Sequence, residues 1–354
     1  MAKPFVSVLI DTYNHERFIE KAIVSAIEQD FSASDREILV VDDGSTDRTL
    51  EIVRKFVPHV RVLHKPNGGQ ASAFNAGIPE CKGKIVAFLD GDDWWVKEKL
   101  SIVSATFEQN PDVGSVGHGY LMVDASGKLQ SIVAPEKTYH FDVRSESGAR
   151  LFSQLRCFMG ASKVAYRKSI LDQILPIPEG AFIEADEFLF TVATCLMSVI
   201  ILEQPLFYYR FHEGNFYMIQ QSDERRFRRK YESLVCLLQN LPPRMDALQT
   251  SPEVKRIMLE PLAIEVRGHR LLLDGGSRWE MFNLELAAAR IAYRHTPLGY
   301  RLFKSMVLGL ALLLPSRQFL RLKRWYTAKN LRNVRKWIGE PVPAAPIIQR
   351  TSQK

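Results

Sequence analysis

The sequence has few cysteines, and none of them lie close together. Its four cysteines, among 354 residues, are Cys81, Cys157, Cys195 and Cys236. They are separated by 76, 38 and 41 positions, so no pair has the spacing of a zinc site or of a small disulfide framework. We therefore expect reduced thiols with a structural role.

A long apolar run is also lacking. The longest apolar stretch, residues 306–314, is nine residues long and ends at Pro315, whereas a helix that spans a bilayer needs about 20 apolar residues. The first residues lack the apolar segment and cleavage site of a secretory signal. These absences predict no transmembrane helix and a cytoplasmic protein.

Two common phosphate-binding patterns are missing. A dinucleotide site would need GxGxxG after the first predicted strand, but the turn there reads Tyr13-Asn14-His15-Glu16. No GxxxxGK[ST] sequence occurs, which excludes a P-loop. Binding of NAD or FAD is therefore disfavoured.

The composition is that of a globular protein with an uneven charge distribution. It is 46% hydrophobic and 25% charged, which excludes a disordered or fibrous chain. Residues 1–221 hold 22 Lys and Arg against 29 Asp and Glu, a net charge of −7, while residues 222–354 hold 25 against 11, a net charge of +14. We expect the two parts to meet different partners: the acidic part a metal ion, the basic part phosphate, nucleic acid or an anionic membrane.

Strand-like and helical patterns alternate along the first 110 residues, which predicts βαβ units and a mainly parallel sheet. Apolar helical faces recur at Ile19, Ile23 and Ala26, and again at Ile52 and Val53. The predicted strands are residues 5–10, 37–41, 60–64 and 84–89.

The rest of the chain changes character near Ser222. Strands are predicted at residues 113–123, 162–166, 198–202 and 206–211, with a helix over 184–197. From Asp223 onward the pattern is almost entirely helical. We expect a domain over residues 1–221, a helical basic region over 222–340 and a loose tail over 341–354.

Acidic and polar residues follow three of the predicted strands. They are Asp11 to Asn14, Asp42 to Ser45, and Asp90 to Asp93. Any one of these loops is explained by ordinary turn and capping residues. Because ligands of open α/β sheets bind beyond the carboxyl ends of the strands, the three together predict a binding edge.

A phosphorylated ligand at this acidic edge would be repelled unless a cation offset the charge. Carboxylate oxygens suit Mg²⁺ or Mn²⁺, and Asp90 and Asp92 are separated by a single glycine at a strand end. We therefore expect a divalent metal cofactor held by Asp90 and Asp92.

Four segments in order resemble family 2 glycosyltransferases of the GT-A fold: residues 6–14, 38–47, 67–77 and 88–93. The resemblance is clear over residues 5–100 and weaker to His212, roughly 60% of the chain. It implies a Rossmann-like α/β sheet, to which the pattern after Ser222 adds a helical, basic C-terminal appendage. It also implies an inverting, hexosyltransferase-like enzyme that moves a sugar from a nucleoside diphosphate to an acceptor hydroxyl, in cell-surface polysaccharide or glycolipid synthesis.

The resemblance also implies residues that bind the nucleotide sugar. Asp43 is expected at the base edge, with Asp42 as the alternative. Many members have Arg where this chain has Phe74, so the identity of the base is left open. The expected nucleotide-sugar-binding residues are Thr12, Tyr13, Asn14, Glu16, Asp42, Asp43, Asn67, Gly69, Asn75, Asp90 and Gly91.

The residues Asp90, Gly91 and Asp92 match the family's DxD motif, which implies that Asp92 and Asp90 bind the metal. His212 matches a family position after a strand and is expected to bind metal or diphosphate. A single histidine beside aromatic residues is as well explained by a packed structural role.

The family's general base is an aspartate near a helix start, and Asp186 in Glu184-Ala185-Asp186-Glu187 fits this position. A carboxylate there can accept the proton of the attacking hydroxyl. The alternative is that these acids only occupy the first turn of a helix, where negative charge is favoured.

The appendage has a basic and aromatic segment over residues 298–338. Cations and interleaved aromatics of this kind suit a helix on an anionic membrane, at the inner face of the cell membrane, with a sugar or lipid-linked acceptor. A buried helix with a solvated basic face explains the pattern equally well. No nucleic-acid-binding module is recognisable. The cations are Arg317, Arg321, Lys323, Arg324, Lys329, Arg332, Arg335 and Lys336.

Two other functions remain as alternatives. A nucleotidyltransferase on a related sheet would need a Gly-rich, basic signature after the first strand, which this chain lacks. A nucleotide-sugar-binding protein without turnover would be expected to have lost the DxD carboxylates or the base, but both are present.

Overall fold

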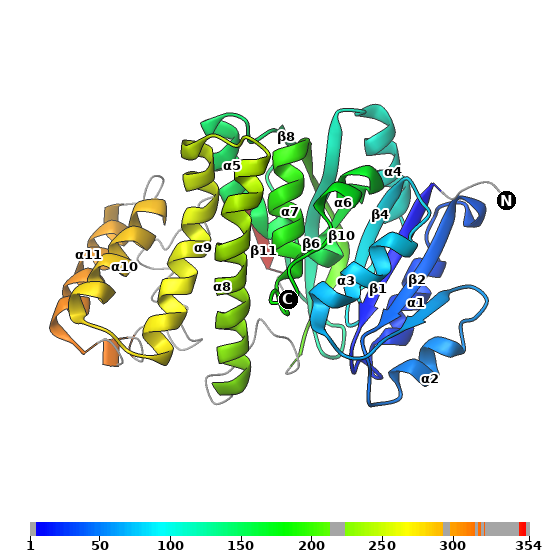
Figure 1. The fold of residues 1–354 in the computed structure, drawn as a ribbon, viewed down its shortest axis with the longest axis horizontal. Coiled ribbons are helices and arrows are strands. Elements are labelled where there is room, and N and C mark those ends of the chain that lie inside the picture. The colour runs from blue at the N-terminus through cyan, green and yellow to red at the C-terminus, as the bar shows by residue number, and fades with distance from the viewer. Residues whose placement is uncertain are drawn as a thin grey trace. The chain divides into compact units, whose positions relative to one another are not determined.

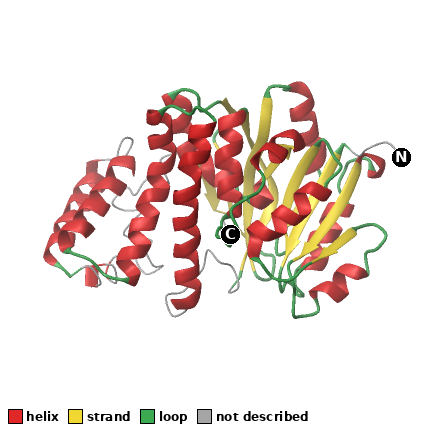
Figure 2. Ribbon diagram, in the orientation of Figure 1, coloured by secondary structure: helices red, strands yellow, loops and turns green. Residues whose placement is uncertain are grey.

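The computed structural model describes residues 5–212, 224–292, 298–315, 318–319, 322 and 347–351. The chain divides into two compact units, residues 1–258 with 348–354, and residues 259–347. The first unit is a mixed α/β fold and the second is helical, which confirms the predicted fold class (Figure 2).

The first unit is built on parallel strands that follow the expected order. β1 (Val6–Thr12) pairs in parallel with β2 (Arg36–Asp42) and β4 (Ile85–Asp90), and β2 pairs with β3 (Arg61–His64) (Figure 1). The four predicted strands are confirmed, with ends shifted by a residue or two. All carboxyl ends of these strands therefore meet at one edge of the sheet.

Helices cover both faces of this sheet, which is why Val8, Leu9 and Ile10 of the central strand are all buried. Side chains of α1 (Ile19–Ile27) share a core with Val8 and Ile10 of β1. On the other face, Gly77 of α3 (Gly69–Glu80) lies against Leu9. The remaining helix of this part is α2 (Thr49–Arg54), and the turn η1 covers Ala33–Asp35.

The sheet continues through strands of mixed direction. The order is β11-β7-β6-β9-β4-β1-β2-β3, and β10 pairs with β5, β6 and β8. The two strands predicted at residues 198–202 and 206–211 form one strand, β10, with a register shift at Pro205. These strands are β5 (Trp94–Trp95), β6 (Val113–Asp124), β7 (Leu129–Pro135), β8 (Tyr139–Phe141), β9 (Val164–Arg167), β10 (Ser198–Phe211) and β11 (Ile347–Thr351).

Helices α4 (Lys99–Gln109), α5 (Glu146–Leu155) and α6 (Lys168–Ile174) connect these strands, with short turns η2 (Arg156–Phe158) and η3 (Ala161–Lys163). The helix predicted at residues 184–197 is α7 (Ala185–Leu196). These elements bring η3 and the start of α7 to the edge formed by β1 and β4.

The first unit extends beyond the boundary expected near Ser222. Helix α8 (Glu224–Ala247) belongs to it, and α8 buries a stripe of apolar side chains at Leu234, Leu237 and Leu241. The division between the units falls inside α9 (Pro252–Leu273). The tail also differs from expectation, because residues 347–351 form β11 rather than a loose segment.

The second unit contains α10 (Arg278–Ala292) and α11 (Leu298–Leu313) around a small apolar core. Leu271, Met281 and Ala311 are buried in that core. None of the helices in the described ranges is long and apolar enough to cross a membrane. The basic residues predicted from 317 to 336 lie outside the described residues.

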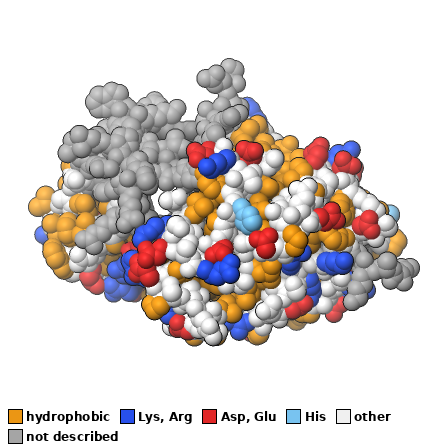
Figure 3. All heavy atoms as spheres, turned by 90° about the horizontal axis from the view of Figure 1, so that it is seen from above, with side chains coloured by type: hydrophobic (Ala, Val, Ile, Leu, Met, Phe, Trp, Pro, Cys, Tyr) orange, Lys and Arg blue, Asp and Glu red, His pale blue; other side chains and the backbone are white. Residues whose placement is uncertain are grey.

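Charge is mixed on the face seen in Figure 3. Described acidic and basic side chains lie interspersed there, with apolar side chains between them.

Candidate active site

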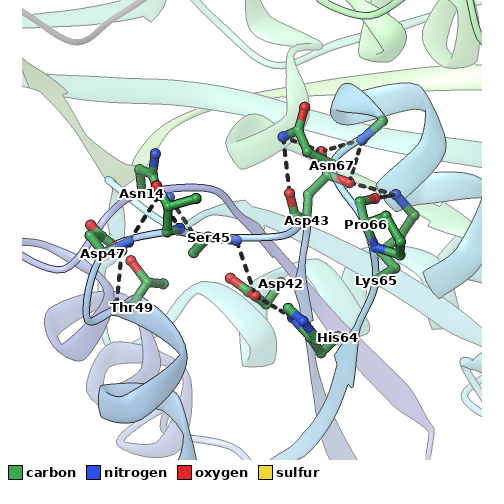
Figure 4. A network of polar contacts seen from close by, with 12 residues as sticks. Asn14, Asp42, Asp43, Ser45, Asp47, Thr49, His64, Lys65, Pro66 and Asn67 are labelled. Atoms are coloured by element: carbon green, nitrogen blue, oxygen red, sulfur yellow. Dashed lines mark hydrogen bonds and ion pairs between the residues drawn. The ribbon is translucent and has the colours of Figure 1, made fainter.

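Asn14 joins the loops that follow β1 and β2 (Figure 4). Its backbone N–H donates to Ser45 Oγ at 2.9 Å, and its Oδ1 accepts from the Thr46 N–H at 2.7 Å. Asn14 has a φ of +56°, a left-handed conformation that Asn tolerates better than most residues. Glu16 extends the junction, because its N–H donates to the Asp47 carboxylate at 3.0 Å.

Asp43 closes the next turn and is almost fully buried (Figure 4). Its carboxylate accepts from Lys65 Nζ at 2.6 Å, from Asn67 Nδ2 at 3.1 Å and from the backbone N–H groups of Gly68 and Gly69 at 3.0 and 2.7 Å. The start of α3 is thus bound to the end of β2. The predicted residues Asp43, Asn67 and Gly69 are brought together.

Gly69 has a structural reason to be glycine. Its φ is +83°, and a Cβ there would lie 2.4 Å from the Phe182 ring. The residue therefore lets the loop before α7 approach α3 closely.

Asp42 is fully buried beside Asp43. Its Oδ2 accepts from His64 Nδ1 at 2.7 Å and from the Ser45 N–H at 3.3 Å, while Oδ1 has no hydrogen-bond partner among the described residues. These contacts hold the strand end in place.

Asn75 lies away from this group of contacts, inside α3. Its Nδ2 donates to the Ile177 carbonyl and its Oδ1 accepts from the Ile177 N–H, both at 2.8 Å. Asn75 thus binds the chain after α6, and these contacts lend no support to its predicted place beside a nucleotide.

A cluster of partly buried carboxylates lies where β1 and β4 end. Asp11 and Asp90 are opposite each other in the parallel pairing of these strands. Burial, with the charges of Asp92 and Asp186, raises the pKa of Asp90 to about 7. Burial, with the charges of Asp90 and Asp92, raises the pKa of Asp11 well above its usual value. The edge therefore holds more negative charge than its immediate partners offset.

Gly91 allows the turn after β4 to pass close to the loop after β1. A Cβ at Gly91 would lie 2.6 Å from Thr12 Oγ1 and 2.8 Å from His15 Nδ1. Those two atoms lie within hydrogen-bond distance of each other, at 3.2 Å. The predicted residues Thr12 and Gly91 are thus neighbours, and His15 joins them although the sequence did not single it out.

Asp92 and His212 contact each other across the site. His212 Nε2 lies 3.0 Å from Asp92 Oδ2, and the two side chains are 11% and 15% exposed. Burial acts to raise the pKa of Asp92, but the charge of His15 and the hydrogen bond and charge of His212 outweigh it and lower the pKa. His212 also packs against the ring of Phe18, a contact of the kind expected for a packed structural role, and its role in binding metal or diphosphate stays a prediction.

The donor atoms at this edge fit a divalent cation. Asp90 and Asp92 offer carboxylate oxygens and His212 an imidazole nitrogen, which Mn²⁺ or Mg²⁺ sites use. Across the described ranges, however, no three His, Cys, Asp or Glu side chains are grouped as they would be around a metal ion. The excess of partly buried carboxylates is the observation that favours a cation.

Asp186 lies in the first turn of α7, beside the same cluster. Its Oδ2 accepts from the Ala161 N–H at 3.1 Å and its Oδ1 from the Glu187 N–H at 2.9 Å. Burial, with the charge of Glu184, raises the pKa of Asp186 to about 6. Its charge in turn contributes to the raised pKa of Asp90.

The neighbouring acids have different partners. Glu184 forms an ion pair with Lys230 at 3.1 Å, and Glu187 forms one with Arg156. Asp186, in contrast, accepts from backbone N–H groups. Among these three acids, Asp186 is therefore the best placed to accept a proton.

Two buried residues of the site gave no signal in the sequence. Ser162 contacts Asp90 from a turn 72 positions away, and Lys99 is fully buried beneath that turn. Burial lowers the pKa of Lys99 well below its usual value, while the charges of Asp93 and Asp90 act in the other direction. A lysine at a helix start is usually read as exposed, so only the structure places it here.

Known proteins of similar sequence are glycosyltransferases. Residues 7–175 match the sequence model described as Glycosyl transferase family 2. An uncharacterized glycosyltransferase of Nostoc sp. is 33% identical over 228 residues, which cover 60% of this chain and 66% of the relative. Poly(ribitol-phosphate) beta-N-acetylglucosaminyltransferase TarS of Staphylococcus aureus is 31% identical over 214 residues, 57% of this chain and 35% of the relative.

Solved structures share the fold. The crystal structure of S. aureus TarS 1-349 in complex with UDP superposes with a TM-score of 0.57 at 19% identity, over 92% of this chain and 93% of that chain.

A further relative by sequence is the chondroitin synthase of Pasteurella multocida, which is 37% identical over 134 residues that cover 33% of this chain and 14% of the synthase. These curated relatives are matched over less than two thirds of their own length.

Proposed function

Because residues 7–175 form a domain of glycosyl transferase family 2, we propose that this protein is an inverting glycosyltransferase. It would move a sugar from a nucleoside diphosphate to an acceptor hydroxyl. The observation that carries the proposal is the position of Asp186, a carboxylate with a raised pKa beside the acidic cluster at the ends of β1 and β4. At that position Asp186 would be a proton acceptor next to the proposed donor site.

On the donor side, we assign the nucleoside to the loop after β1, with Thr12, Tyr13, Asn14 and Glu16. Tyr13 is 40% exposed and is therefore available to a ligand. The base edge is assigned to Asp43, with Asp42 as the alternative. Structures of the related TarS contain UDP and UDP-GlcNAc, so UDP-sugars are the first donors to test.

The diphosphate is assigned to Asp90, Gly91 and Asp92, with His212 beside them. These carboxylates would hold Mn²⁺ or Mg²⁺, which supplies positive charge against the leaving diphosphate. His212 and Asp92 together would then orient one side of the diphosphate.

On the acceptor side, Asp186 accepts the proton of the attacking hydroxyl. As that oxygen bonds to the anomeric carbon, the bond from this carbon to the diphosphate oxygen breaks, so the anomeric configuration inverts. A carboxylate with a pKa of about 6 is a stronger base than an ordinary aspartate and is still largely ionised near pH 7. No covalent enzyme intermediate is required.

The proposed process is synthesis of cell-surface polysaccharide or glycolipid. Support comes from the names of two relatives, a chondroitin synthase and the poly(ribitol-phosphate) transferase TarS. Peripheral attachment to the inner face of an anionic membrane is proposed through residues 298–338. In the described part of that segment, Met306 and Leu313 are 56% and 70% exposed.

The experiment is a screen of UDP-, GDP- and dTDP-sugars with Mn²⁺ or Mg²⁺, following release of the nucleoside diphosphate. We expect metal-dependent release with one donor class, and loss of that release in the Asp186→Asn variant. Asp35→Asn is the matched control, because Asp35 is exposed and directly precedes β2, at the opposite edge of the sheet. If the wild type binds a donor without releasing the nucleoside diphosphate, the nucleotide-sugar-binding alternative is favoured. If it shows no binding and no release with any donor, the proposal is rejected.

A further inference from the structure

The short turn η3 contacts both carboxylates that the proposed reaction needs. Ser162 Oγ accepts from the Asp90 N–H and donates to Asp90 Oδ2, each at 2.9 Å. The adjacent residue, Ala161, donates its N–H to Asp186 Oδ2 at 3.1 Å. Two consecutive residues therefore fix the donor-side and the acceptor-side aspartates.

A buried lysine holds this turn from below. Lys99 Nζ donates to the Ser162 carbonyl at 2.8 Å and lies 4.1 Å from the centre of the Trp95 ring. Its side chain is 0% exposed. Burying an ammonium group costs free energy unless partners compensate it, so filling space alone is a poor reason for a lysine here.

We propose that Lys99 and Ser162 are positioning residues that hold η3, and through η3 set the separation between Asp90 and Asp186. This inference rests on the proposed function, since it concerns the two carboxylates assigned to donor and acceptor. The physical reason is that two neighbouring, partly buried carboxylates repel each other, and side chains free to rotate would turn apart. A turn bonded to both and anchored by Lys99 resists that rotation.

A purely structural role makes a different prediction. If Ser162 and Lys99 only stabilise the fold, their removal lowers the free energy of unfolding but leaves each folded molecule as active as before. If they position the carboxylates, nucleotide binding and turnover change even where stability does not.

The first test compares Ser162→Ala with Ser104→Ala. Both serines are buried, but the Ser104 hydroxyl has no hydrogen-bond partner among the described residues. We expect Ser162→Ala to raise the Kd for UDP with Mn²⁺ and to lower kcat, each by roughly 10- to 100-fold, because a hydrogen bond to a charged group is lost. Ser104→Ala should leave both values near wild type. Equal Kd and kcat in the two variants would overturn the proposal.

The second test asks whether Lys99 acts through the same turn. Lys99→Met should also lower kcat, and the double variant with Ser162→Ala should lose less than the product of the two single effects, because both act on one turn. Fully multiplicative losses would mean that Lys99 acts elsewhere. If Lys99→Met does not fold, the serine pair decides alone, because Ser162→Ala removes a single buried oxygen.

Failure of the proposed function has a separate signature. It would appear as a wild type that turns over no donor. In that case, a crystal structure of Ser162→Ala still tests the inference. An Asp90 carboxylate that keeps its wild-type position and distance from Asp186 would overturn it, and a displaced carboxylate would support it.

Discussion

The Glu184 carboxylate lies 3.1 Å from the Lys230 ammonium, and the two side chains are 9% and 12% exposed. Glu184 has a φ of +71° and stands two positions before Asp186. Lys230 belongs to α8, beyond the expected end of the catalytic domain. Ser233 of the same helix accepts from the Ile183 N–H at 3.2 Å. Helix α8 thus shapes the loop that leads to Asp186.

The first prediction concerns this ion pair. Lys230→Met should lower the free energy of unfolding by roughly 3 kcal/mol, because a nearly buried carboxylate loses its cation. Urea denaturation measures the change. Arg228→Met is the control, since Arg228 forms an exposed pair with Glu224 and should matter little. Adding Glu184→Gln to Lys230→Met should restore part of the lost free energy of unfolding. An Arg228→Met variant as unstable as Lys230→Met would contradict a specific role for the ion pair between Glu184 and Lys230.

The second prediction identifies the base. Asp186→Asn keeps the shape of the side chain but removes the proton acceptor, so kcat should fall by roughly 10² or more while the donor Kd changes little. Steady-state kinetics and calorimetry measure the two values. Near-normal turnover in Asp186→Asn, with an inactive Glu184→Gln or Glu187→Gln, would move the base to one of those residues.

The third prediction is a pH dependence of opposite sign for activity and stability. Burial and the charge of Glu184 raise the pKa of Asp186 from 3.8 to about 6. Activity needs the ionised base, so kcat should fall as pH drops through about 6. Stability instead falls as pH rises from about 4 to about 6, because the folded state binds the proton more tightly than the unfolded state.

Asp186→Asn cannot ionise and should escape this loss. Above pH 6, we expect its free energy of unfolding to exceed that of the wild type by roughly 1 to 3 kcal/mol, with little difference at pH 4. Urea denaturation at pH 4 and pH 7.5 gives the comparison. If the difference in free energy of unfolding between the variant and the wild type is the same at both pH values, the Asp186 pKa is not raised.

The sequence predicted the parallel half of the fold well. Strands β1, β2 and β4 have buried apolar centres because both faces of this part of the sheet are covered, and their polar ends mark the edge where Asn14, Asp43 and Asp90 lie. Helices α3, α4, α5 and α6 were missed. Helix α3 is rich in Gly and Ala and has a weak apolar pattern, and the other three connect short or irregular strands.

Long-range contacts were beyond reach of local patterns. Ser162 meets Asp90 across 72 positions, and no periodicity encodes such a contact. The expected boundary near Ser222 follows the change from strands to helices, but helical periodicity is the same in α8 and in the helices of the second unit, so it cannot tell which core a helix joins. Only the packing of α8 beside α7 settles that α8 belongs to the first unit.

The fourth prediction concerns the metal. Mn²⁺ or Mg²⁺ and a nucleoside diphosphate should bind together, because the acidic edge repels the diphosphate without a cation and the cation gains ligands from it. Asp92→Ala should abolish metal-dependent binding and Asp90→Ala should weaken it, as measured by calorimetry with UDP, GDP and dTDP. Equal binding of all three with and without metal would contradict the prediction.

The fifth prediction concerns the membrane. Replacing Arg321, Lys323 and Arg324 by Gln should weaken binding to anionic vesicles on the order of 100-fold, since each cation near such a surface contributes about 1 kcal/mol. The control replaces three exposed cations of the first unit, Arg54, Lys82 and Lys97, by Gln, which removes the same charge elsewhere. Co-sedimentation of the full chain with phosphatidylglycerol vesicles should decrease as the salt concentration rises. It should also decrease in the variant at Arg321, Lys323 and Arg324, but not in the control variant. Equal losses in the two triple variants would indicate attraction by net charge, and no pelleting of the wild type at low salt would remove the case for a membrane surface.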